Sequence, residues 1–346
     1  MGIVIYVASG TGALSKLGRV KMDHDIVIKN LTKTYKILEK RGAGFVNLFK
    51  RSYKDHTALS NISFTINKGE AMGMVGPNGA GKTTTMKVLS GILHPTGGSV
   101  QVRTYIPFEK KHAFLRQISF VMGRKNQLIW DLPAIDTFRL NKEIYELDDA
   151  TYKRSTSTLL DFLDAHELIY RPVKTLSLGQ RMRLELVAAL LHNPSILFLD
   201  EPTLGLDIIV HSSILQFLHE YRQEFHPTIL LSSHDMRDVE KLTNSLLLVN
   251  KGKIIYQGTL NKLARTYGTH KRIRVVREKS YIPSEKIKKL IIADTFPLLE
   301  LRVKRSHLES TVAQLLSESK CTDLTVENEP IEKVIEEVLH KSSLLL

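Results

Sequence analysis

The sequence predicts an α/β domain with a parallel-sheet core, followed by a small α+β domain. Short, continuous apolar runs at residues 196–199 and 228–232 have the length and composition of strands that are buried on both faces. Apolar residues at helical spacing lie between such runs, most clearly at residues 179–192. A glycine-rich turn at residues 76–84 joins a short strand to a helix. Buried strands that alternate with helices are typical of a doubly wound α/β domain.

Two strands open the predicted domain. Residues 26–31 and 59–66 alternate apolar and polar side chains, as half-buried strands do. The basic segment between them contains Gly42 and Gly44, which indicate a loop over at least part of its length. Residues 71–75 then form a short strand, which the glycine-rich turn connects to the first long helix.

The middle of the chain is predicted to be mostly helical. Residues 134–175 are polar and have helical spacing, and residues 156–168 are their clearest amphipathic stretch. Residues 245–258 predict a hairpin that turns at Lys251 and Gly252.

The pattern changes after about residue 265. Alternating strands are predicted at residues 272–276 and 297–303, and amphipathic helices at residues 307–319 and 331–341. Strands and helices of this length make a small α+β appendage of the main domain.

Length and composition place the chain among globular proteins of more than one domain. Its 346 residues are 42% hydrophobic and 25% charged, which excludes a disordered or collagen-like chain. A single cysteine excludes a disulfide framework and a cysteine-rich metal site. The 49 Lys and Arg exceed the 36 Asp and Glu and give a net charge of +13. We therefore expect an anionic partner: nucleic acid, the inner face of a membrane, or a polyphosphate ligand.

The N-terminus carries neither a membrane span nor a secretory signal. No apolar run of the chain reaches the roughly 18 residues that a membrane-spanning helix needs. The apolar run at residues 3–8 is short and precedes its basic residues, in the reverse of the order found in signal peptides. Because Met22 opens a more typical cytosolic start, we expect residues 1–21 to be a non-native or disordered extension.

The most specific motif runs from Gly76 to Thr83 and matches G-x-x-x-x-G-K-[ST] in full. Its glycines allow backbone N–H groups to surround phosphate oxygens, and the positive end of the following helix points at the same place. Lys82 can reach the β- and γ-phosphates, and the Thr83 hydroxyl can ligate Mg²⁺. The alternative is a glycine-rich turn that caps a helix.

Two consecutive acids, Asp200 and Glu201, follow the buried strand of residues 196–199. The carboxyl end of such a strand is where α/β folds bind ligands. Asp200 is suited to hold Mg²⁺ and Glu201 to polarise an attacking water. Alone, this pair would indicate only a strand that ends at a solvated turn, but it accompanies a complete phosphate loop.

The third motif is a capping box. Ser177 precedes Gln180 by three residues at the start of the helix at 179–192. The motif predicts a well-capped helix, and the N-terminus of that helix is also able to bind an anion.

In this order, the three motifs followed by His234 resemble the ATP-binding-cassette (ABC) ATPases, which drive transporters. The resemblance implies a phosphate-loop ATPase cassette over residues 22–265, with a parallel-sheet core, an antiparallel β subdomain and a helical subdomain at about 124–190. Residues 266–346 form a C-terminal α+β accessory domain outside it. The implied cofactors are ATP and Mg²⁺.

The resemblance also implies roles for individual residues. Tyr35 is expected to stack on adenine, Asp207 to communicate across a dimer, and His234 to contact the γ-phosphate. The residues expected to act in catalysis are Glu201, His234 and Gln127. The residues expected to bind the metal are Thr83, Asp200 and Gln127. The residues expected to contact the nucleotide are Tyr35, Gly76, Pro77, Asn78, Gly79, Ala80, Gly81, Lys82, Thr83, Thr84, Ser177, Gly179, Gln180 and Asp207.

Two positions depart from the family pattern. Leu178 stands where the family usually has glycine, although Ser177 and Gly179 remain beside it. The glutamine expected to sense Mg²⁺ and water is either displaced to Gln127 or replaced by Arg124. We assign it to Gln127, because a guanidinium does not ligate a cation.

The resemblance further implies partners. The chain has one phosphate loop and one copy of the family's signature motif, residues 176–180. It therefore requires a second copy or a homologous cassette, so that each signature motif faces the other chain's phosphate loop. An integral-membrane permease must supply the channel, which places the chain peripherally on the cytoplasmic face of the cell membrane. The overall pattern most resembles the bacterial ATPase subunits of ABC-2 exporters. The alternative is a non-transport cassette ATPase acting on nucleic acid or ribosomes, but such proteins usually carry two cassettes or a coiled coil, and no nucleic-acid partner is expected here.

Overall fold

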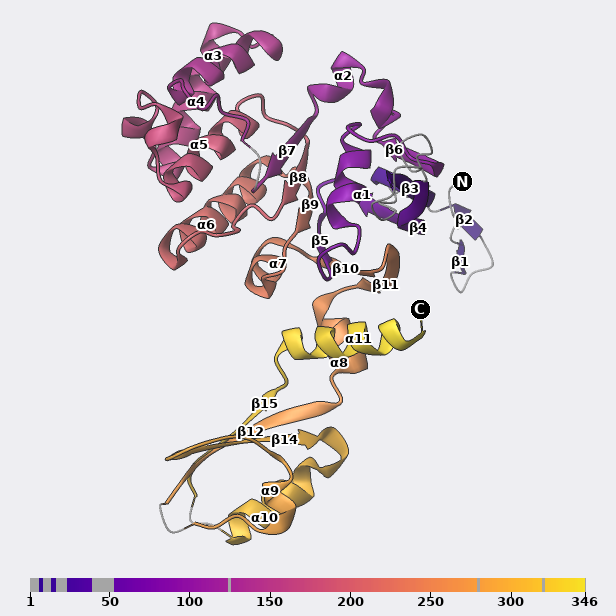
Figure 1. Cartoon of the computed structure of the whole chain (residues 1–346), viewed down its shortest axis with the longest axis vertical. Coiled ribbons are helices and arrows are strands. Elements are labelled where there is room, and N and C mark those ends of the chain that lie inside the picture. The colour runs from indigo at the N-terminus through magenta and orange to yellow at the C-terminus, as the bar shows by residue number, and fades with distance from the viewer. Residues whose placement is uncertain are drawn as a thin grey trace, which may run out of the picture. The chain divides into compact units, whose positions relative to one another are not determined.

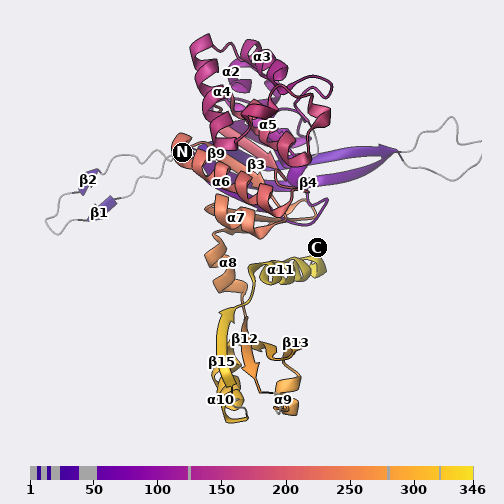
Figure 2. The ribbon, with the colours of Figure 1, turned by 90° about the vertical axis from the view of Figure 1, so that its left-hand side faces the viewer.

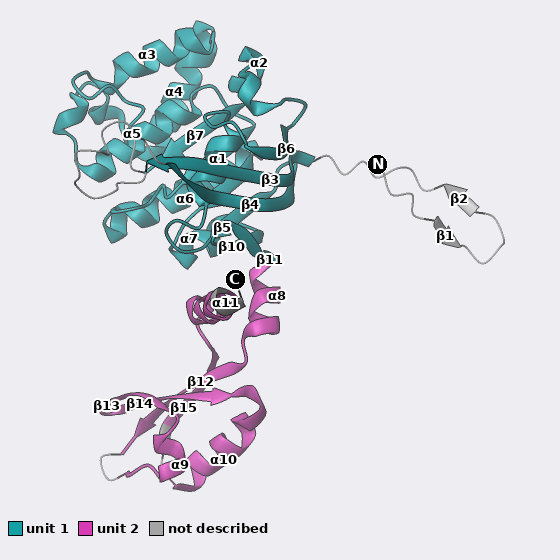
Figure 3. Cartoon of the chain, turned by 45° about the vertical axis from the view of Figure 1, so that its right-hand side comes forward, with its two compact units in different colours: residues 1–257 teal, residues 258–346 magenta. Residues whose placement is uncertain are grey.

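The computed structural model of the chain describes residues 6–8, 14–16, 24–38, 53–123, 126–278, 281–318 and 321–345. It divides into two compact units, residues 1–257 and 258–346 (Figure 3). The predicted domain boundary near residue 265 falls inside helix α8 (Leu260–Tyr267), which belongs to the second unit. Most of the predicted extension at residues 1–21 lies outside the described residues, except for a pairing of β1 (Tyr6–Ala8) with β2 (Leu14–Lys16).

A six-stranded sheet forms the centre of the first unit (Figure 1). Its order is β11-β10-β5-β9-β8-β7, and the five strands from β10 to β7 are parallel. The predicted hairpin is confirmed: Lys251 and Gly252, both at positive φ, connect β10 to β11. The strands are β5 (Ala71–Val75), β7 (Ile118–Met122), β8 (Ile196–Asp200), β9 (Thr228–Ser232), β10 (Ser245–Asn250) and β11 (Lys253–Gly258).

Strand β8 shows why the central strands read as continuous apolar runs. Ile196 and Phe198 point to one face and join the core that includes α1 (Lys82–Leu89). Leu197 and Leu199 point to the other face and join the core of α5 (Leu178–Leu190) and α6 (Ile208–Phe225). Each such buried side chain stabilises the fold by about 1.5–3 kcal/mol. The predicted parallel-sheet core is therefore confirmed.

A second, antiparallel sheet has the order β4-β3-β6. Helix α1 contacts β8 and β9 of the central sheet as well as β4 and β6, so it lies between the two sheets. β3 (His24–Leu38) and β4 (Tyr53–Asn67) are longer than predicted and project as a ribbon beyond the rest of the unit, as Figure 2 shows. The third strand is β6 (Gly97–Val102). Residues 39–52 of the predicted basic loop lie outside the described residues.

The predicted helical region consists of α3 (Ala134–Ile144) and α4 (Asp149–Leu163), which pack on α5. α5 and α6 cover the face of the central sheet opposite α1 (Figure 1). The remaining helices of the unit are α2 (His112–Leu115) and α7 (Met236–Leu242).

The second unit is an α+β domain, as predicted. Its antiparallel sheet has the order β13-β14-β12-β15, and its core joins Ile273, Leu299 and Leu301 of the sheet to Ile287 and Leu315 of two helices. After α8, its elements are β12 (His270–Arg277), α9 (Glu285–Lys288), β13 (Ile291–Thr295), β14 (Leu298–Lys304), α10 (Leu308–Glu318), β15 (Cys321–Asn328) and α11 (Ile331–Leu345). Among the residues that the structure describes, no helix combines the length and the apolar composition that crossing a membrane requires.

Candidate functional site

A cavity of about 900 Å³ lies where β5, β8 and β9 end. The whole glycine-rich loop, residues 76–84, lines it. Tyr35 from β3, Asp200, Glu201 and His234 are also part of the lining. Four segments that are far apart in the chain thus meet in one place.

The glycine-rich loop needs glycine at two positions for different reasons. At Gly76 a Cβ atom would lie 2.1 Å from the Val249 carbonyl oxygen, so no side chain fits. Gly81 has φ +107°, and its Cβ would lie 2.6 Å from Leu59 Cδ2. Gly81 is also the N-cap of α1, whose first turn contains no acidic residue. The unpaired N–H groups of this helix end therefore offer a site for an anion.

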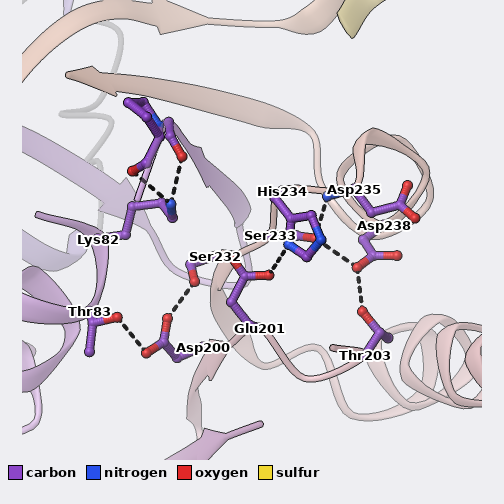
Figure 4. A network of polar contacts seen from close by, with 12 residues as sticks. Lys82, Thr83, Asp200, Glu201, Thr203, Ser232, Ser233, His234, Asp235 and Asp238 are labelled. Carbon is purple, nitrogen blue, oxygen red and sulfur yellow. Dashed lines mark hydrogen bonds and ion pairs between the residues drawn. The ribbon is translucent and has the colours of Figure 1, made fainter. Parts of the chain in front are cut away.

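The Lys82 ammonium lies folded back on the loop (Figure 4). Its Nζ donates to the carbonyl oxygens of Gly76, at 2.6 Å, and Pro77, at 3.3 Å. Burial lowers the pKa of Lys82, and the nearby Glu201 and Asp200 carboxylates oppose this effect. The amine is thus a partly desolvated donor, which strengthens its attraction to an anion that enters the cavity.

Asp200 connects the loop to the sheet. Its Oδ2 accepts from the Thr83 hydroxyl at 2.7 Å and its Oδ1 from the Ser232 hydroxyl at 2.5 Å (Figure 4). The carboxylate is buried, and both of these donors are neutral. A buried carboxylate beside a hydroxyl at the edge of the cavity is the set of hard oxygen ligands that Mg²⁺ prefers, so these residues fit that ion.

Glu201 and His234 form a second pair in the cavity lining, with His234 Nδ1 2.6 Å from Glu201 Oε2 (Figure 4). Glu201 has a left-handed backbone (φ +53°), which costs about 1–3 kcal/mol for a residue other than glycine. Its amide N–H donates to the Ser232 carbonyl at 3.0 Å and holds it there. Gly123 passes so close that a Cβ there would lie 2.1 Å from the Glu201 carbonyl oxygen.

The structure adds His56, which sequence reasoning missed. It is paired with Tyr35 across the β3–β4 ladder, and both residues line the cavity. The ammonium of Lys33 lies 5.2 Å from the centre of the Tyr35 ring. Pairing Tyr35 with a residue of the second strand would have required the strand register, which the sequence pattern does not supply.

The signature residues and Asp207 are not brought to the cavity; they lie at the starts of α5 and α6. The predicted capping box of Ser177 and Gln180 is confirmed in both directions, at 3.2 and 3.0 Å. Gly179 packs against Val210, where a Cβ would lie 2.8 Å from Cγ1. Asp207 caps α6 by accepting from the backbone N–H groups of Ile209 and Val210.

Gln127 is also outside the cavity lining, in contrast to its predicted place beside the metal. Its side-chain amide donates to the Phe120 carbonyl in the middle of β7 at 3.0 Å. Its backbone N–H donates to the buried carboxylate of Glu185, whose pKa is raised by that burial. The other candidate, Arg124, lies outside the described residues.

Comparison with known proteins identifies the family of this chain. Residues 59–204 match the ABC transporter family model. The chain is 31% identical to the ABC transporter ATP-binding protein NatA of Bacillus subtilis over 215 residues, which are 62% of this chain and 87% of NatA. This chain belongs to the ABC transporter ATP-binding proteins. It is also 33% identical to the lantibiotic transport ATP-binding protein SrtF of Streptococcus pyogenes, over 61% of this chain and 90% of SrtF.

Solved structures agree with this assignment. The ATP-binding subunit of an ABC transporter superposes with a TM-score of 0.59 at 25% identity, over 70% of this chain and 93% of that subunit. A dimeric post-hydrolysis state of the cassette MJ0796, bound to ADP and Pi, has the same fold, with a TM-score of 0.57 at 24% identity over 68% of this chain and 98% of that one. As a member of this family, the chain is an ATPase, and ATP is its ligand.

Proposed function

We propose that this chain is the ATP-hydrolysing subunit of a membrane exporter and that the cavity is its ATP site. The observation that carries the proposal is the meeting of the glycine-rich loop, the Thr83–Asp200 pair and the Glu201–His234 pair in one cavity. Such an arrangement offers phosphate binding, metal binding and water activation within a few ångströms of one another.

Phosphate binding would come first. The N–H groups of residues 76–84 and the start of α1 surround the phosphates, while Lys82 leaves the two loop carbonyls for the β- and γ-phosphate oxygens. Tyr35, on the rim formed by β3, offers its ring to adenine. The exchange of a neutral carbonyl for a charged phosphate oxygen favours the bound state.

Hydrolysis would depend on the two acids. Thr83 and Asp200 would hold Mg²⁺, which supplies positive charge to the β- and γ-phosphates when bound. Glu201 would accept a proton from the attacking water. His234, through its contact with Oε2, would orient that carboxylate and reach the γ-phosphate with the other ring nitrogen. The metal and the base thus use neighbouring residues at the end of one strand.

A second chain would complete the site. Ser177, Gly179, Gln180 and Asp207 lie at helix starts outside the cavity, and we expect this region to contact ATP held by a second copy or a homologue. A capped helix start whose Ser177 is exposed is suited to an anion on a facing subunit.

The membrane partner would be an integral permease, with this chain bound peripherally at the cytoplasmic face. Ile129 and Trp130 are 40% and 48% exposed beside the helical region, and exposed apolar groups of this size mark interfaces. The neighbouring Leu128 is buried. The names of two relatives support export: linearmycin resistance for LnrL of Bacillus subtilis and Nod factor export for a protein of Ralstonia nicotianae.

Affinity purification of the tagged chain from its native cells in detergent tests this proposal. A polytopic membrane protein recovered at about one-to-one stoichiometry, together with ATP hydrolysis by the purified complex, is the expected result. Recovery of ribosomal proteins or nuclease-sensitive nucleic acid without a membrane protein would contradict the transport role and leave the ATPase assignment intact.

A further inference from the structure

A buried polar cluster lies outside the cavity lining, where α6 meets the segment that follows β9. It consists of His211 on α6, Asp235 at the N-cap of α7 and Asp238 in the first turn of α7. One donor atom from each residue lies within 4.8 Å of the other two. His211 Nε2 is 2.9 Å from Asp238 Oδ1 and 3.7 Å from Asp235 Oδ2.

Asp238 is the member of the cluster that needs explanation. Its side chain is completely buried, and its Oδ2 accepts from the hydroxyls of Thr203, at 2.6 Å, and Ser233, at 2.8 Å (Figure 4). Both hydroxyls are neutral, so the carboxylate still needs a positive partner. Its Oδ1 has no hydrogen-bond partner among the described residues, and neither has Nε2 of His211.

The geometry between these two atoms is that of shared ligands. They lie 2.9 Å apart without forming a hydrogen bond, so the ring nitrogen does not direct its proton or lone pair along the line that joins them. Bonds of about 2.1 Å that meet at the tetrahedral angle of Zn²⁺ place two ligand atoms about 3.4 Å apart, so these two atoms would need to separate by only about 0.5 Å to bind one ion. Asp235 Oδ2 offers a third ligand, since its side chain is 22% exposed and leaves a path for the ion and for water.

From this arrangement we propose that His211, Asp235 and Asp238 bind one divalent transition-metal ion of the Zn²⁺ type. An imidazole ligand with two carboxylates favours Zn²⁺ over Mg²⁺ or Ca²⁺, which prefer oxygen ligands alone. The ligands are themselves held in place, as those of metal sites are: Thr203 and Ser233 donate to Asp238, and Arg237 Nε donates to both oxygens of Asp235.

A second cluster of one histidine and two carboxylates differs from the first in how its carboxylates are paired. In the second unit, His270 lies with Glu329 and Glu337, but the guanidinium of Arg302 donates to both glutamates. There one guanidinium bridges both carboxylates, whereas in the first cluster Arg237 donates to Asp235, and Asp238 has no guanidinium or ammonium partner among the described residues. His270 serves as the matched control for His211.

Zinc titration of the full-length, EDTA-treated chain without nucleotide tests the site. Calorimetry with ZnCl₂ should show a tight binding step of one ion per chain, and MgCl₂ should not produce it. His211→Arg places a fixed cation beside Asp238, so the protein should fold and lose the tight step, with Zn²⁺ affinity reduced at least about 10-fold. His270→Gln should keep the step unchanged.

Circular dichroism checks that each variant is folded, and His211→Gln replaces His211→Arg if the latter does not fold. Visible absorption of bound Co²⁺ gives a second readout that does not depend on ATP hydrolysis. An absent tight step in the native chain would overturn the proposal. A step of equal affinity in both His211 variants would also overturn it, because the ion would then lie elsewhere.

Discussion

His192, directly after α5, makes the stability of the first unit dependent on pH. Its ring stacks on Tyr145 with 3.7 Å between the ring centres, and Nε2 lies 3.1 Å from the Ile118 carbonyl oxygen of β7. Nδ1 is buried without a hydrogen-bond partner among the described residues. The neutral ring, with its proton on Nε2, satisfies this environment, whereas a second proton on Nδ1 would have no acceptor. Burial accordingly lowers the pKa of His192 from 6.5 to about 4.

The magnitude follows from this difference in pKa. In the unfolded chain His192 has a pKa near 6.5. As the pH falls, the unfolded state therefore binds a proton at a higher pH than the folded state, and this binding stabilises the unfolded state. The free energy of unfolding therefore keeps its full value above pH 6.5 and falls as the pH drops towards 4. The loss is about 2 kcal/mol at pH 5 and about 3 kcal/mol below pH 4.

Urea unfolding of the full chain at pH 7 and pH 5 measures this effect, with the fluorescence of Trp130, the chain's one tryptophan, as the probe. The difference in unfolding free energy between the two pH values should be about 2 kcal/mol smaller in His192→Gln than in the native protein. His226→Gln, at an exposed histidine of the same unit, should keep the native difference. Equal differences in the native protein and His192→Gln would refute the reasoning.

Three further predictions concern the cavity. Glu201→Gln should retain ATP binding and lower phosphate release by about 10²–10⁴-fold, because the amide cannot accept the water proton; unchanged release would exclude Glu201 as the base. Gly81→Ala should abolish ATP binding in a fluorescent-nucleotide titration, since φ is +107° and the new Cβ would lie 2.6 Å from Leu59, and a native Kd would contradict this account. Chelation with EDTA should stop hydrolysis and added Mg²⁺ should restore it, whereas phosphate release that continues in EDTA would argue against a metal held by Thr83 and Asp200.

The sequence was sufficient for the central strands and the phosphate loop because their determinants are local. Residues 228–232 are apolar throughout, and β9 covers the same residues, since a strand buried on both faces requires every position to be apolar. The loop at Gly76–Thr83 depends on glycines whose lack of a side chain is required at fixed positions. Such constraints are visible in one short stretch of sequence.

The features that sequence reasoning missed depend on which strand residues pair with one another and on the route of the backbone after β7. β3 continues to Leu38 because Leu38 pairs with Tyr53, and an exposed ribbon carries no alternation of buried side chains to reveal its length. His56 reaches the cavity through the same register. Gln127 was assigned to the metal because the chemistry of its amide suits a cation, but the fold directs that amide to the Phe120 carbonyl instead.

The close passage of Gly123 against Glu201 has a mechanical consequence. The amide of Gly123 donates to the Asp200 carbonyl at 3.0 Å, and its Cα faces the Glu201 carbonyl with no side chain between the two backbones. A displacement of the chain leaving β7, which continues towards the exposed Trp130, therefore acts on the proposed base through direct backbone contact, without an intervening layer of side chains. Because the two backbones touch at Gly123, a small movement at the outer surface would change the position of the Glu201 carboxylate. Any residue larger than glycine at position 123 would push the two backbones apart.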